Sequence, residues 1–96
     1  MDKFSIDSFN NFFEAVLKLD SLEQAHKFFE DICTIKELES LSQRLEVAAM
    51  LKAGKNYQEV TRSTGASTAT ISRVNKYLLY GRGGYDMVLN TAEDEK

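Results

Sequence analysis

Apolar residues recur along this chain with the spacing of helices. The first set falls at positions i, i+3, i+4, i+7 and i+8 of one amphipathic helix and comprises Phe9, Phe12, Phe13, Val16 and Leu17. Asp7 or Ser8 is the expected N-cap of this helix. The chain contains no proline, so nothing interrupts the backbone hydrogen bonds of long helical segments. The pattern therefore predicts an all-α fold.

Capping pairs mark where the later helices begin. The spacing of a capping box occurs three times, at Ser21 with Gln24, Thr34 with Glu37, and Asn56 with Glu59. The first pair opens a helix that carries Leu22, Ala25, Phe29 and Ile32. The second opens a segment that ends with Gly54 as the C′ residue. Nothing in residues 35–53 forces a break, although Ser42 could start a new turn.

Residues 60–74 have the spacing of a helix-turn-helix, in which the second helix lies in the DNA major groove. Val60, Ile71 and Val74 are placed to pack the two helices together, and Gly65 suits the tight turn between them. Ala66 is small enough for the corner. Ser67 caps the second helix, which runs over about Ser67–Tyr80 and ends before Gly81. Its outward face carries Thr68, Ala69, Ser72, Arg73 and Lys76.

The chain is expected to form one domain, residues 1–96, with three parts. Residues 1–53 form a helical dimerisation part and residues 54–80 the helix-turn-helix. Residues 81–96 form a glycine-rich loop and an acidic tail, with a short helical turn at 85–89 that docks on the body. The N-terminal part is rich in phenylalanine, and a second copy of the chain is the simplest cover for that apolar surface. The alternative is that the phenylalanines only close the monomer core.

Charge is segregated along the chain, although the net charge is only −3. Residues 1–40 sum to −5, residues 41–83 to +5 and residues 84–96 to −3. The basic part coincides with the helix-turn-helix, as expected for a surface that meets the phosphates of double-stranded DNA. Chance clustering on a solvated surface is the alternative.

Other chemistry finds little support in the sequence. The single Cys33 excludes an intrachain disulfide and a multi-cysteine metal site, and fits a reduced cytoplasm. His26 is the only histidine and is expected to pack or face solvent, so we expect no catalytic residues, no metal and no cofactor. No apolar run reaches transmembrane length, and no secretory signal is recognisable, so membrane association is not expected.

With these features placed, the chain resembles the Trp repressor family, particularly its YerC/YecD-like branch. The resemblance covers roughly Phe9 to Leu79 and is densest in Thr34–Gly54 and Gly65–Arg73. It implies an intertwined homodimer in which the N-terminal helices wrap around the partner. It also implies that the segment after Thr34 forms two helices with a break near Ser42.

The resemblance further implies a ligand pocket. Counterparts of the residues that bind the tryptophan co-repressor are Thr34, Arg44, Thr70 and Arg73. However, Val74 stands where the repressors have glycine and Tyr77 where they have serine. These larger side chains are expected to fill the indole slot, so tryptophan is not the expected effector, and whether another small molecule binds stays open. From the residues alone, Arg44 is also placed to form an ion pair with Glu39, Glu46 or Glu59, or to hold a phosphate.

Two functions compete. The first is a sequence-specific, repressor-like transcriptional regulator, in which Arg73 binds a guanine and Lys76 a phosphate. Thr68, Ala69 and Ser72 would contact bases or phosphates. Ser67 is primarily a cap, and its helix terminus can approach a phosphate. Four residues flank the first motif helix near where a DNA backbone would pass, namely Lys55, Tyr57, Gln58 and Arg62. The alternative is that these four are ordinary polar residues of the surface. The second function is a helical protein–protein interaction module without specific DNA binding.

Overall fold

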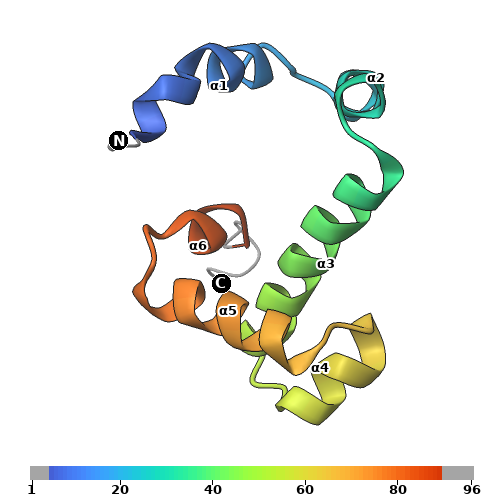
Figure 1. Cartoon of the computed structure of the whole chain (residues 1–96), viewed down its shortest axis with the longest axis vertical. Helices are drawn as coiled ribbons and strands as arrows, with labels where there is room; N and C mark the ends of the chain where they lie inside the picture. Colours follow the sequence, from blue (N-terminus) through green and yellow to red (C-terminus); the bar gives the residue numbers. More distant parts are fainter. Residues whose placement is uncertain (1–4, 90–96) are drawn as a thin grey trace. The chain divides into compact units, whose positions relative to one another are not determined.

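The computed structural model describes residues 5–89, which form helices and turns and contain no strand. The helices follow one another as a 3-10 helix Ile6–Phe9, α1 Asn10–Val16, α2 Leu22–Ile32, α3 Ile35–Lys52, α4 Tyr57–Thr64, α5 Thr68–Tyr80 and α6 Gly84–Leu89 (Figure 1). The predicted all-α fold is confirmed. The chain divides into two compact units, one ending at Ile35 and one beginning at Lys36, and the predicted acidic tail beyond residue 90 lies outside the described residues.

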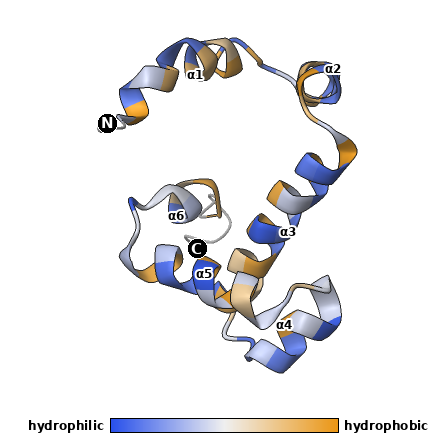
Figure 2. Cartoon of the chain, in the orientation of Figure 1, coloured by the Kyte–Doolittle hydropathy of each residue, from blue (hydrophilic) through white to orange (hydrophobic). Residues whose placement is uncertain are grey.

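Aromatic rings join α1 to α2 in the first unit. The ring of Phe12 stacks on that of Phe28 with centroids 6.2 Å apart, and Phe28 meets Phe29 edge-on at 5.2 Å. None of the side chains of residues 5–35 is fully buried. Apolar and hydrophilic residues alternate along both helices (Figure 2), so each has an apolar face that the first unit does not enclose.

The predicted N-caps of the first unit are confirmed only in part. Ser21 caps α2 by accepting a hydrogen bond from the Gln24 N–H. However, the Gln24 side chain accepts from the Asp20 N–H at 2.9 Å and not from Ser21, so the box is not reciprocal. The expected cap at Asp7 or Ser8 is wrong. Ser5 caps the preceding 3-10 helix instead by accepting from the Asp7 N–H, because that extra turn moves the helix start upstream.

Helix α3 is continuous from Ile35 to Lys52. The break near Ser42 that the family resemblance implied is therefore wrong. The local sequence explains the difference, since residues 35–53 include no glycine or proline to interrupt the backbone ladder. The helix ends as predicted, because Gly54 takes a φ of +88°. The Lys55 N–H then donates to the Met50 carbonyl at 3.1 Å, which closes a Schellman motif.

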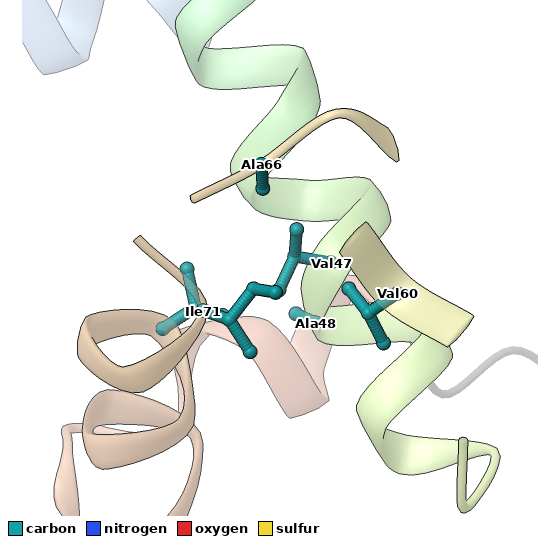
Figure 3. Close-up of a cluster of buried hydrophobic side chains, with 6 residues drawn as sticks. Val47, Ala48, Val60, Ala66 and Ile71 are labelled. Carbon is teal, nitrogen blue, oxygen red and sulfur yellow. The ribbon is translucent and has the colours of Figure 1, made fainter. Parts of the chain in front are cut away.

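The core of the second unit lies between α3, α4 and α5. It consists of Val47, Ala48, Val60, Ala66, Ile71 and Val74, each at most 2% exposed. Figure 3 shows Val47 and Ala48 of α3 beside Val60 of α4 and Ile71 of α5, with Ala66 from the turn above them. The predicted packing of the two motif helices is thus confirmed. The core also fixes both motif helices on α3.

The short helix α6 docks on this core. Tyr85 and Leu89 pack against the buried cluster, and the Lys52 Nζ lies 2.9 Å from an oxygen of Asp86. The helical turn predicted at 85–89 is therefore confirmed, with Gly84 as its first residue. Within residues 5–89, no helix is long and apolar enough to cross a membrane.

Candidate nucleic-acid interface

Local hydrogen bonds set the geometry of α4 and α5. Asn56 and Glu59 form a complete capping box, with the Asn56 side chain accepting from the Glu59 N–H at 2.9 Å and the Glu59 carboxylate accepting from the Asn56 N–H at 3.0 Å. Gly65 ends α4 in the left-handed region at φ +76°, which an L side chain adopts only at a cost. The Ser67 hydroxyl then accepts from the Thr70 N–H at 3.1 Å and starts α5. The caps and the turn predicted for this motif are confirmed.

Helix α5 has two distinct faces. Ile71 and Val74 are buried against α3 and α4. The other face carries the five side chains predicted to contact DNA, and all five are exposed: Thr68, Ala69, Ser72, Arg73 and Lys76. The buried face therefore anchors the helix, while the opposite face is free to enter a groove.

The cations of this surface have no acidic partners within the described residues. Arg62, Arg73, Lys76 and Lys55 are exposed, and none of them forms an ion pair in residues 5–89. The Lys76 Nζ lies 5.7 Å from the centre of the neighbouring Tyr77 ring, a distance at which the aromatic face attracts the ammonium group. Their positive charge is therefore available to an anionic partner.

A cleft separates α4 from the start of α5. Its walls are Tyr57, Gln58, Thr61 and Arg62 of α4 and Thr68 of α5, and its volume is about 550 Å³. The cleft brings together three residues from the predicted DNA-binding set, Gln58, Arg62 and Thr68. Thr61 was missed by sequence reasoning. Its position one helical turn after Tyr57 places it on the same face of α4, but only the cleft distinguishes it from other polar residues of the helix.

The ligand pocket implied by the family resemblance stays a prediction, because its four residues are divided between the two units of the chain. Arg44 and Tyr77 line an open groove of about 420 Å³, with Leu41 and Leu45 of α3 and Arg82, Gly84, Tyr85 and Val88 around α6. Thr70 instead accepts a hydrogen bond from the Ser67 hydroxyl at 3.2 Å. Arg73 is exposed, and Thr34 belongs to the first unit. Val74 is buried in the core.

The expected ion pair of Arg44 is wrong. Arg44 is half-buried and pairs with none of Glu39, Glu46 and Glu59. Arg44 instead lines the groove together with Tyr77 of α5 and Tyr85 of α6.

Comparison with known proteins places this geometry in a family. The family model described as Trp repressor protein matches residues 7–93. YerC of Bacillus subtilis (strain 168) is 46% identical over 94 residues, which cover 98% of this chain and 90% of YerC. A solved TrpR-like protein from Eubacterium eligens ATCC 27750 is 52% identical, with a TM-score of 0.83 over 88% of this chain and 87% of that chain.

A second solved structure comes from Staphylococcus aureus and is of a protein proposed to be a Trp repressor. It is 45% identical, with a TM-score of 0.83 over 88% of this chain and 85% of that chain. The family match, the sequence identity and the structural likeness agree over nearly the whole length. The chain belongs to the Trp repressor family, in the branch that contains YerC.

Proposed function

We propose that this protein is a dimeric, sequence-specific DNA-binding regulator of transcription, with α5 as its recognition helix. The observation that carries the proposal is the division of α5 into a buried and an exposed face. Ile71 and Val74 anchor the helix, while Arg73 and Lys76 stand on its exposed face among small polar side chains and form no ion pair with any residue from 5 to 89. This combination suits a helix that enters the major groove. Membership of the Trp repressor family supports the same function.

DNA binding is tested by selecting fragments from genomic DNA and measuring their affinity at several salt concentrations. Because Lys and Arg displace counterions from the phosphates, log affinity should fall linearly with log salt concentration. A random duplex should bind more weakly than a selected fragment. Equal affinity for both duplexes would reject specific recognition, and no affinity for either would favour a protein–protein interaction module. Because the relatives come from bacteria, in which the DNA lies in the cytoplasm, we propose the cytoplasm as the place of action.

We also infer a homodimer, because the first unit leaves large apolar side chains uncovered. Ile6, Leu17 and Leu22 are each more than 60% exposed, and Phe13 is 41% exposed. Exposed apolar surface of this kind marks an interface. The groove between α3, α5 and α6 is a second apolar surface that a partner can cover. A two-fold dimer would place two recognition helices on half-sites about one DNA turn apart.

Sedimentation at micromolar concentration should show a species of twice the 10.9 kDa chain mass. Leu17→Glu should shift this species toward the monomer, because it places a charge in the proposed interface. It should not destabilise the single chain, in which Leu17 is 81% exposed. Lys18→Glu is the matched control, since it puts the same carboxylate on the neighbouring exposed residue. A wild-type protein that sediments only at 10.9 kDa would reject the dimer.

We further propose that tryptophan is not the effector. Val74 fills core space between the helices, and Tyr77 stands beside Arg44 in the groove of the second unit. Calorimetric titration with tryptophan should therefore give no binding heat, with the protein at concentrations where it binds DNA. Saturable heat would contradict the proposal.

A further inference from the structure

In the part of the chain that the structure describes, every residue that lines the cleft between α4 and α5 has a side chain that can donate hydrogen bonds. These are the phenol of Tyr57, the amide of Gln58, the hydroxyls of Thr61 and Thr68, and the guanidinium of Arg62. Among the residues that the structure describes, no carboxylate lines the cleft. A concave surface with several donors and one fixed positive charge is suited to an anion.

The acidic side chain of α4, Glu59, is engaged in a capping box. Glu59 is the only acid between Tyr57 and Thr64, and its carboxylate accepts the Asn56 N–H in the capping box. Thr64 is also committed, because its hydroxyl donates to the Val60 carbonyl at 2.7 Å and accepts from the Ala66 N–H at 3.1 Å.

The donors of the cleft, by contrast, are available. Within residues 5–89, the side chains of Tyr57, Thr61 and Arg62 form no hydrogen bond or ion pair. Tyr57 and Thr61 are one helical turn apart and so lie on the same face of α4. Arg62 follows directly and brings the charge.

We propose that this cleft binds one backbone phosphate of DNA through the hydroxyls of Tyr57 and Thr61 together with the Arg62 guanidinium. The proposal rests on the proposed function and adds a positioning contact to it. A phosphate held here would fix the register of α5 on the duplex, while Arg73 and Lys76 approach the groove from the neighbouring helix.

Neutral donors give this contact a distinctive signature. Counterion release depends on the number of cations that meet phosphates. Thr61→Val and Tyr57→Phe remove a hydroxyl and no charge, so each should weaken binding several-fold and leave the salt slope unchanged. Arg62→Gln should weaken binding and also reduce the slope by about 1.

The experiment uses the full chain and a DNA fragment selected by the wild type. Single phosphates are replaced one at a time by neutral methylphosphonates, and the affinity is measured for wild type, Thr61→Val and Tyr57→Phe. We expect one position in each half-site at which the replacement weakens wild-type binding several-fold. At this position it should weaken the binding of either variant less, because Arg62 still contacts the phosphate but one hydroxyl is absent. Ser63→Ala is the matched control, because Ser63 is exposed on α4 and outside the cleft, and it should keep the full wild-type penalty.

The proposal is overturned if methylphosphonate replacement weakens the binding of Thr61→Val and Tyr57→Phe as much as that of wild type at every position. It is also overturned if either variant changes the salt slope. Titration with inorganic phosphate, followed by the amide NMR signals of Tyr57 and Thr61, separates this failure from that of the proposed function. Saturable shifts that disappear in Arg62→Gln would support an anion site in the cleft. If the protein shows these shifts but binds no DNA, DNA is rejected as the source of the phosphate. If it shows neither shifts nor DNA binding, both the phosphate site and the proposed DNA-binding function are rejected.

Discussion

Ile71→Ala should lower the free energy of unfolding by about 2–5 kcal/mol. Ile71 is fully buried and among the largest side chains of the core, where it joins α5 to α3 and α4. Its truncation removes apolar contacts and leaves a cavity that the surrounding residues fill only in part. Since small domains are stable by about 5–15 kcal/mol in total, a loss of this size places the variant close to unfolding. Urea titration followed by circular dichroism measures it.

Leu79→Ala is the control on the same helix, because Leu79 is 61% exposed. This change should alter the free energy of unfolding of the isolated chain only slightly. A larger loss that grows with protein concentration would indicate that a partner chain covers Leu79. A cost for Ile71→Ala below about 1 kcal/mol would contradict its role as the link between the two motif helices and α3. Because both variants introduce alanine into α5, the difference between them measures the contribution of core packing and not the helical propensity of α5.

The sequence was a good guide where short-range interactions decide the structure. Gly65 has the positive φ that the turn requires, and Asn56 and Ser67 make cap bonds to residues three positions ahead. These features depend on neighbours in the chain, so their spacing alone predicts them. Val60 and Ile71 are buried as expected, because a helix-turn-helix constrains which faces can meet.

Predictions that relied on resemblance or on distant groups were less secure. The break near Ser42 was carried over from the family, whereas the residues around it favour one continuous helix. That Arg44 would line a groove and pair with none of the three acids could not be predicted, because part of the groove comes from α5 and α6, more than thirty residues away. Thr61 was overlooked for a similar reason. On α4 it is an ordinary polar residue, and it gains significance only when Thr68 of α5 is placed across the cleft.

The exposed position of Arg73 gives the sharpest test of the recognition helix. Arg73→Ala should weaken binding to a selected fragment by about 1–3 kcal/mol and relax the preference at one base pair. The reason is that an arginine can donate two hydrogen bonds to guanine O6 and N7, which no other base pair accepts in the same geometry. The side chain lies on the surface of α5 opposite the buried Ile71 and Val74, so its removal should leave the free energy of unfolding unchanged.

Arg73→Lys separates base reading from charge. Lysine keeps the positive charge but lacks the planar fork that makes two parallel bonds. If Arg73 reads a base, the lysine variant should keep the wild-type salt slope and still lose discrimination at the same base pair. If Arg73 only neutralises a phosphate, the lysine variant should keep both the wild-type affinity and the discrimination between bases. The alanine variant should then bind all duplexes more weakly by the same factor, and its salt slope should be lower by about 1. Affinities for the selected fragment and for its single-base variants, measured at several salt concentrations, decide between these outcomes. Unchanged binding of Arg73→Ala to the selected fragment would remove Arg73 from the interface altogether.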